Sequence, residues 1–324
     1  MRPDAVGLVA GYVLDALVGD PRRYHPVAGY GRLAAALERR LYAPTRAAGA
    51  AYTAVAVGVP VAAALAATVA TRRRPVARAA LMAGVTWAAL GGRSLRREAK
   101  VMGAALGAGD LAVARARLNH LCGRDPSGLD AAQLSRATVE SVAENTSDAE
   151  VAPLLWGALL GPAGVVGYRA ANTLDAMVGH RSPRYARFGT AAARLDDVAS
   201  LLPARVTGLL TVAAAPLAGG RAGVAWRVFR RDRGAHPSPN AGQCESAMAG
   251  ALGVRLGGRN VYVGRTEVRP EMGDGQPPGP ADVGRAARLS AAVGVAALGL
   301  AALLAARRQA GPPPVRGAGC GRSR

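Results

Sequence analysis

Three acidic residues in the middle of this 324-residue chain have the spacing of one helix face. Glu140, Glu144 and Asp148 follow one another at intervals of four residues, which places their side chains on the same side of an α-helix. Carboxylates at this spacing repel one another, so the arrangement requires cations nearby, either a divalent metal ion or a group of arginines. A solvated helix face beside a buried helix would show the same pattern, and the spacing is compatible with both interpretations.

A second group of polar residues follows an apolar segment that contains no acidic residue. It consists of Asn172, Asp175, His180, Arg181, Arg184, Tyr185, Arg194, Asp196 and Asp197. The chain between residues 138 and 202 therefore holds two concentrations of ionisable side chains on either side of an apolar stretch.

Five sequence blocks resemble the signature of one known family. Three are ENTSDxxVAPLLW, AANTLDAMVGHRSPRYxxFG and AARLDDVASLLPARVT; the others are LDALVGDPRRYHPVAGYGRLAAALE near the start and HPSPNAGQCESAMAGALGVRLGG near residue 236. Together they extend from about residue 11 to residue 262. In order and content they resemble the CobD/CbiB family of adenosylcobinamide-phosphate synthases, the membrane-embedded amide-forming enzymes of cobalamin biosynthesis.

The resemblance implies a reaction between a carboxylate of adenosylcobyric acid, an adenosylated corrinoid, and the amine of (R)-1-amino-2-propanol or its O-phosphate. The product is adenosylcobinamide or its phosphate. A carboxylate does not condense with an amine in water until its oxygen becomes a better leaving group, so ATP is the expected activator. Such a reaction needs Mg²⁺, cations that stabilise the transferring phosphoryl group and a base for the attacking ammonium.

The resemblance also suggests roles for the polar residues of these blocks. The candidate catalytic acids, as metal ligands or bases, are Glu144, Asp148, Asp175, Asp196 and Asp197, of which Glu144 and Asp148 are expected to hold Mg²⁺. The candidate substrate-binding residues are His25, Asn145, Asn172, Arg181, Arg184, Arg194, His236, Asn240 and Glu245. A structural role remains open for two of these places: His25 as a loop residue bonded to the backbone, and the HPSPN loop as a helix cap.

One feature departs from the expected chemistry and two depart from the family pattern. No P-loop of the GxxxxGK[ST] type is present, and Lys100 is the only lysine, so ATP is expected from the resemblance and from energetics alone. Where the family pattern has Asp-Gly, this chain has Asp148-Ala149-Glu150. QCES at 243–246 replaces a more usual Trp-Pro-Glu-Ala, although Glu245 is retained.

Composition favours a membrane protein over a nucleic-acid-binding protein. Half of the residues are hydrophobic, only 4% are aromatic and the formal charge is +20. No zinc-finger or RNA-binding signature is present, so nucleic acid is not an expected partner. Small apolar residues permit close helix contacts in a bilayer, and arginines beside apolar segments suit anionic lipid. The cysteines, Cys122, Cys244 and Cys320, form no CxxC pair and are expected to be reduced structural thiols.

The elements that must position the polar residues are predicted to be helices throughout, because no run of alternating β-branched residues occurs. The uncharged segment 47–70 and the segment 76–92 are expected to form a membrane hairpin, and 289–306 a further span. Segments 153–171 and 200–219 contain Pro, Gly and Arg, so we expect them to be re-entrant or buried in the bundle.

The predicted fold is all-α, a multi-pass integral membrane helical protein with cytoplasmic helical or loop insertions. Its expected segments are 1–46 (apolar helix and GDPRRYHPV loop), 47–92 (membrane hairpin), 93–152 (soluble helices with the acidic residues), 153–219 (broken apolar helices around a polar motif), 220–288 (polar loop and helix with HPSPNAG), 289–306 (transmembrane helix) and 307–324 (disordered basic tail).

The expected location is the cell membrane, with the site facing the cytoplasm, where adenosylcobyric acid and ATP are made. The expected partners are the corrinoid and aminopropanol (phosphate) substrates and the lipid bilayer, with other cobalamin-assembly enzymes as further candidates. A membrane transporter or corrinoid-handling scaffold is the alternative, because polar residues between broken helices also describe substrate paths. Inverted sequence repeats would favour a transporter, and we find none.

Overall fold

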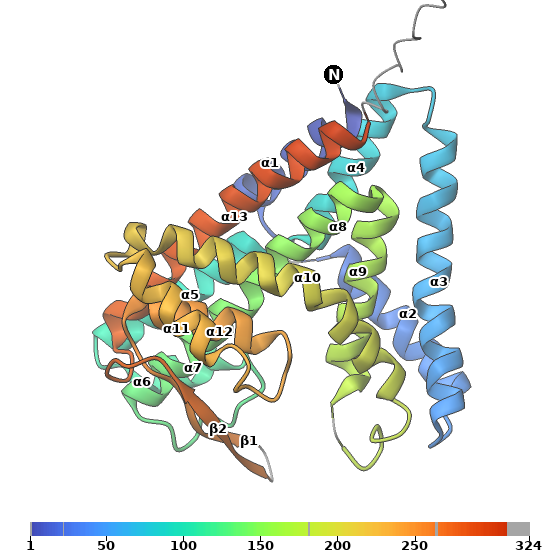
Figure 1. Ribbon diagram of the computed structural model, residues 1–324. Coiled ribbons are helices and arrows are strands. Elements are labelled where there is room, and N and C mark those ends of the chain that lie inside the picture. The colour runs from blue at the N-terminus through green and yellow to red at the C-terminus, as the bar shows by residue number, and fades with distance from the viewer. Residues whose placement is uncertain (1, 22, 181, 263–264, 310–324) are drawn as a thin grey trace, which may run out of the picture.

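The structure is a computed structural model that describes residues 2–21, 23–180, 182–262 and 265–309. It is mostly helical, and Figure 1 shows three groups of elements joined by the long helix α10 (Thr190–Ala214). The predicted substrate residue Arg181 and most of the predicted tail, 310–324, lie outside the described residues.

The first group of helices surrounds α1 (Pro3–Val18). It also contains α4 (Pro75–Ala89), α8 (Ala152–Leu160) and α13 (Pro280–Arg308). Gly7 and Gly11 lie one helical turn apart on α1 and let α4 approach closely, since a Cβ at Gly11 would lie 2.6 Å from the Cβ of Thr86. In the first turn of α1, the buried Asp4 accepts a hydrogen bond of 2.6 Å from Arg78 on α4 and pairs with Arg308 on α13. This carboxylate therefore joins α1 to both helices.

The second group forms the largest apolar core around α7 (Ala131–Thr146) and α12 (Ala241–Leu252). The helices α5 (Gly92–Gly107), α6 (Leu111–Leu118) and α11 (Ala222–Asp232) pack around them. Every residue of α12 from Gly242 to Leu252 is buried, and small side chains make this possible. Asp110 caps α6, because its carboxylate accepts the N–H of Val113 at 3.0 Å.

A β-hairpin in the second group corrects the expectation that the chain is helical throughout. Strands β1 (Leu256–Tyr262) and β2 (Arg265–Met272) pair antiparallel. Their sequences, LGGRNVY and RTEVRPEM, lack a regular apolar alternation because the hairpin is anchored at its base, where Leu256 and Met272 are fully buried. Gly257 and Gly258, at φ +89° and +83°, form an irregularity between the strands that few other residues could adopt.

The third group contains α2 (Pro26–Leu41), α3 (Arg46–Ala70) and α9 (Pro162–Leu174). The chain reverses between α8 and α9 at Gly161, whose φ is +69°. The apolar stretch 153–171 is therefore divided between two short helices, as its Pro and Gly residues indicated. A small aromatic core, Tyr42, Tyr52, Tyr185 and Phe188, joins this group to the loop before α10.

Among the described residues, three helices are long and apolar enough to cross a membrane: Arg46–Ala70, Thr190–Ala218 and Pro280–Arg308. The first and last agree with the predicted spans. The predicted span 76–92 is instead α4, whose 15 residues cover only about 22 Å of a hydrocarbon core of about 30 Å. It packs mainly against α1 rather than in a hairpin with α3.

The prediction of a broken helix over 200–219 is wrong. Pro203 lies inside the continuous helix α10, which ends in the short 3₁₀ segment Ala215–Ala218. Proline removes one backbone donor but does not end this helix. Thr207 donates a hydrogen bond of 2.9 Å to the carbonyl of Pro203, and 44% of the apolar window is buried inside the protein.

We predict that Gly11→Ala lowers the melting temperature of the detergent-solubilised protein, because the new Cβ would overlap Thr86 on α4. Overpacking of this kind costs about 1–3 kcal/mol. Gly84→Ala on α4 is the matched control, since a Cβ there meets nothing within 4 Å. Equal melting temperatures for the two variants would show that the close α1–α4 contact does not contribute to stability.

Candidate active site

A polar cavity of about 220 Å³ lies where α7, α10 and α12 approach one another. It brings together seven of the predicted residues: Glu144, Asp148, Asp175, Asp196, Asp197, His236 and Asn240. Two more are adjacent, because Asn172 donates a hydrogen bond of 3.3 Å to Asp196, and Glu245 lies 3.8 Å from His236. Residues from the central and the HPSPN blocks therefore converge on one place.

The aspartates form one side of this cavity. Asp148 lies in the single π-helical turn η1 (Ser147–Val151), which continues α7. Asp175 begins the corresponding turn η2 (Asp175–Gly179), which continues α9. The phenol of Tyr168 donates a hydrogen bond of 3.2 Å to Asp148. Burial, reinforced by the charges of Asp196 and Glu144, raises the pKa of Asp148 to about 8. Without a cation this side of the cavity thus favours bound protons.

The turn η1 is anchored by Glu150, the acid that departs from the family pattern. Its fully buried carboxylate accepts a hydrogen bond of 2.6 Å from Arg96 on α5. Two glycines leave room for it: a Cβ at Gly92 or at Gly294 would lie 2.3 Å from an atom of the carboxylate. Glu150 therefore points away from the aspartates and fixes η1 against α5 and α13.

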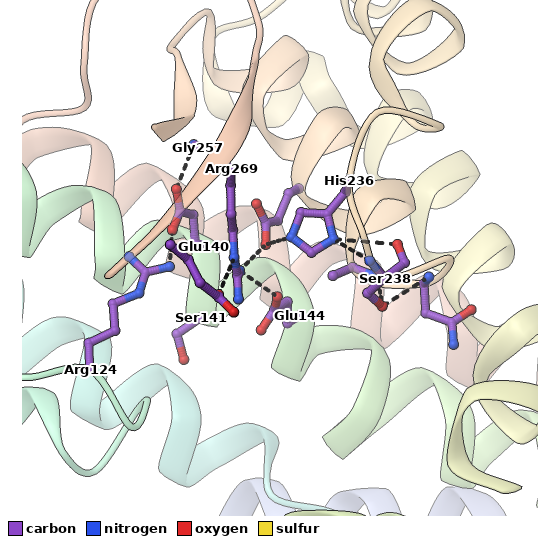
Figure 2. A network of polar contacts seen from close by, with 12 residues as sticks. Arg124, Glu140, Ser141, Glu144, His236, Ser238, Gly257 and Arg269 are labelled. Carbon is purple, nitrogen blue, oxygen red and sulfur yellow. Dashed lines mark hydrogen bonds and ion pairs between the residues drawn. The ribbon is translucent and has the colours of Figure 1, made fainter. Parts of the chain in front are cut away.

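Glu144 and His236 line the other side of the cavity, with Arg269 reaching in from β2 (Figure 2). Glu245 is buried beside it, 3.8 Å from Arg269. The guanidinium of Arg269 lies 4.0 Å from Glu144 and 3.8 Å from Glu245. Burial, followed by the charge of Glu144, raises the pKa of Glu245 well above its ordinary value. Burial and the nearby Arg269 lower the pKa of His236, which keeps the imidazole neutral.

The loop before α12 fixes the orientation of His236. The backbone N–H of Ser238 donates to Nδ1 of His236 at 3.0 Å. The hydroxyl of Ser238 accepts the N–H groups of Asn240 and Ala241, so Ser238 caps the helix in place of Asn240. The amide of Asn240 instead donates to the carbonyl of Asp197 at 2.8 Å and ties the loop to α10.

Glu140, the first residue of the predicted acidic series, does not line the cavity. It pairs with the buried Arg124 and accepts the N–H of Gly257 at 2.7 Å (Figure 2). This interaction joins α7 to the hairpin that carries Arg269. Of the three acids spaced four residues apart, Glu140 therefore makes a structural contact, whereas Glu144 and Asp148 line the cavity.

Four predicted substrate residues lie elsewhere. Arg184 donates to Glu38 at 3.0 Å and stacks 4.0 Å over the ring of Tyr42. His25 caps α2 by accepting the N–H of Val27 at 3.2 Å, which is the structural alternative left open for it. Asn145 donates to the carbonyl of Ser141 at 2.9 Å, and Arg194 is exposed on α10 outside the cavity lining.

Sequence reasoning missed Arg269 and Tyr168. Arg269 lies on a strand that was not expected, and RTEVRPEM belongs to none of the family-like blocks. Tyr168 lies in the segment predicted to be apolar, and its hydroxyl was the one feature of that residue that could have indicated a role in a polar site. Among the described residues, Arg269 supplies the cationic charge in the cavity that Arg184 and Arg194 were expected to supply.

Two sets of donors could hold a cation. The aspartates offer only oxygen ligands, as Mg²⁺ prefers. Glu144, His236 and Glu245 offer one ligand atom each, and these atoms lie within 4.8 Å of one another. Glu144 was expected to bind a metal ion together with Asp148. It belongs to the second set of donors but lines the same cavity as the aspartates.

A sequence model described as CobD/Cbib protein matches residues 8–290. The chain belongs to the CobD/CbiB family. It is 50% identical over 306 residues to the cobalamin biosynthesis protein CobD of Mycobacterium tuberculosis, covering 94% of this chain and 97% of that relative. The protein of the same name from Geobacter metallireducens is 46% identical over 272 residues, 82% of this chain and 86% of that one. No solved structure matches this CobD/CbiB chain.

We predict that Arg269→Gln destabilises the folded protein by about 1–3 kcal/mol at pH 9 and by less at pH 5, where the contacts of Arg269 with Glu144 and Glu267 are the ones lost. The raised pKa of Glu245 keeps it protonated at low pH, where it needs no counter-charge; the arginine becomes necessary as pH rises and Glu245 ionises.

Melting curves of detergent-solubilised protein at both pH values measure this difference. Arg255→Gln is the matched control on the same hairpin, because Arg255 pairs with the exposed Glu271 at 3.3 Å. A loss at pH 5 as large as at pH 9 would contradict an electrostatic role for Arg269.

Proposed function

We propose that this protein is an enzyme of cobalamin biosynthesis that forms an amide bond between adenosylcobyric acid and (R)-1-amino-2-propanol or its O-phosphate, with ATP as activator. The observation that carries the proposal is the convergence of Glu144, Asp148, Asp175, Asp196 and Asp197 with His236 in one cavity. The name shared by its relatives, cobalamin biosynthesis protein CobD, supports the pathway. The family resemblance supports the ligase reaction.

Mg²⁺ fits the aspartate side of the cavity. Asp148, Asp175 and Asp196 present hard oxygen donors, and burial together with the neighbouring carboxylates raises the pKa of Asp148. Asp148 with these neighbours would hold the ion, which when bound would supply charge stabilisation to phosphate oxygens. Ion binding must displace protons from these carboxylates, so it strengthens as pH rises.

ATP would bind without a P-loop, so its phosphates need other partners in this chain. Arg269 is the arginine that lines the cavity, and it could approach a phosphate or the activated carboxylate. Asn240 and Ser238 fix the loop that forms one wall. These residues hold and orient the reactants and exclude water, and a buried carboxylate takes the proton that the ammonium must lose before attack.

The proposed site faces the cytoplasm. Corrinoid and nucleotide would reach it there without crossing the bilayer. The helix α10 supports this arrangement, since it carries Asp196 and Asp197 near its start and continues as a candidate span to Ala218.

We predict that purified protein given cobyric acid in its adenosylated form, Mg²⁺, ATP and the amine yields the amide product, detected by mass spectrometry. Free and phosphorylated aminopropanol are supplied in parallel. Asp148→Asn should lower turnover by at least about 100-fold because a transition-state charge interaction is lost. Glu271→Gln, an exposed acid on β2, is the control and should retain activity. No product from the unsubstituted protein, or full turnover by Asp148→Asn, would refute the assignment.

For orientation, we predict that Ala186→Cys and Ala235→Cys are protected from a membrane-impermeant thiol reagent in intact cells and react after lysis. Both positions are exposed, Ala186 in the segment before α10 and Ala235 in the loop before α12. The natural cysteines are replaced by alanine in this experiment. Labelling of either position in intact cells would exclude a cytoplasmic site.

A further inference from the structure

One buried acid beside the cavity has no hydrogen-bond partner. Glu245 is fully buried on α12, and neither of its carboxylate oxygens, nor Nε2 of His236, is hydrogen-bonded within the described part of the chain. Leaving buried polar atoms unpaired costs free energy, and proteins rarely do so without a reason. One ligand atom from each of Glu144, His236 and Glu245 lies within 4.8 Å of the other two, and Glu144 and Glu245 are close enough to share a proton. This arrangement indicates a ligand that supplies hydrogen-bond donors.

The charges around Glu245 indicate that the ligand is a cation. Arg269 approaches Glu144 and Glu245 only to 4.0 and 3.8 Å, which is too long for a hydrogen bond. It also lies 3.7 Å from Glu267, so its single charge is shared among three carboxylates. Glu140 is already paired with Arg124. Arg136 adds a more distant positive charge toward Glu245, so once Glu144 and Glu245 are ionised the described residues leave negative charge in excess on this side of the cavity.

The tautomer of His236 argues against a metal ion. A backbone N–H can only donate, so the 3.0 Å contact from Ser238 N makes Nδ1 of His236 the acceptor. The carbonyl of Ser238 is farther away, at 3.4 Å. A neutral imidazole in this state carries its proton on Nε2 and has no lone pair there for a metal. A metal-bound histidine normally has the reverse arrangement, donating through its other nitrogen.

A primary ammonium group fits the same atoms. It has three N–H donors in a tetrahedral arrangement, and acceptors around one nitrogen at about 2.9 Å lie less than about 5 Å apart. The carboxylates of Glu144 and Glu245 meet this spacing, since the candidate ligand atoms lie within 4.8 Å of one another. The Nε2–H of His236 lies 3.8 Å from Glu245, which is beyond hydrogen-bonding distance, so the imidazole positions that carboxylate by filling the space beside it.

We propose that Glu144 and Glu245 bind the primary ammonium group of the amine substrate, with His236 as the positioning residue for Glu245. This assignment rests on the proposed function, in which the amine is the one reactant with such a group. It moves Glu144 from the metal side of the cavity to the amine side. The two reactants then meet within one cavity, the amine between α7 and α12 and the activated carboxylate near the aspartates.

Equilibrium binding tests the assignment without turnover. The full chain in detergent is titrated calorimetrically with (R)-1-amino-2-propanol and with 1,2-propanediol, with and without Mg²⁺ and a non-hydrolysable ATP analogue. We expect the amine to bind and the uncharged diol to bind at least about tenfold more weakly, since hydrogen bonds to charged groups are lost. Glu245→Gln and Glu144→Gln should each weaken amine binding by a similar factor.

Two controls make the result specific. Glu271→Gln, on the surface of β2, should leave amine affinity within about twofold. His236→Gln should weaken amine binding less than Glu245→Gln while leaving the affinity for Mg²⁺ unchanged. Glu144 is half-buried, so Glu144→Gln should fold. It can therefore be tested even if Glu245→Gln fails to fold.

Several outcomes would overturn the assignment. These are equal affinity for amine and diol, unchanged amine binding in Glu144→Gln, or no amine binding by the unsubstituted protein under either condition. Nitrogen-coupled Mn²⁺ resonance that disappears in His236→Gln would instead identify a metal site. Amine binding without product would refute the ligase and keep the ammonium site, whereas turnover with an unchanged KM for amine in Glu144→Gln would refute the site alone.

Discussion

Carboxylates repel one another strongly where water is scarce, and this chain places five of them around a cavity of about 220 Å³. A sixth, Glu245, is buried beside it. Arg269 provides too little positive charge for all of them, so the cavity must retain protons or attract cations. That imbalance would be a defect in a purely structural core. In the enzyme proposed above, it would provide the attraction that brings a metal ion and an ammonium group into the site.

Small side chains allow this charged cavity to form in a mostly apolar protein. Gly and Ala let α12 lie completely buried against its neighbours, and glycines bring α1 and α4 into close contact. The surrounding helices can therefore hold the polar side chains from several directions without large aromatic residues. The long helix α10 links this arrangement to the membrane, because its first turns carry two of the acids and its remainder is long and apolar enough to span.

The sequence was informative about site residues whose chemistry and position in the family-like blocks agree. It was less informative where the backbone geometry determines which side chains reach the site. The acids of the central block and His236 could be assigned to one site for two reasons. Neighbouring carboxylates repel one another unless a cation lies between them, and the central and HPSPN blocks both resemble parts of one family signature. Arg269 could not, since a hairpin held at its buried base needs no alternating pattern. The exact directions of Asp148 and Asp175 depend on π turns, which a helical period cannot reveal. Arg184 and His25 have residue types suited to substrate binding, yet aromatic stacking and helix capping use them instead.

The position of Glu150 between two glycines has a consequence for how such sequences diverge. Its carboxylate occupies the space that side chains at Gly92 and Gly294 would need, and it holds the turn that presents Asp148. These positions lie on α5, η1 and α13, far apart in the chain. A lineage that retains the acid cannot enlarge either glycine, whereas one that replaces it with a small residue gains room at both. Substitutions at the three positions should therefore be inherited as a correlated set.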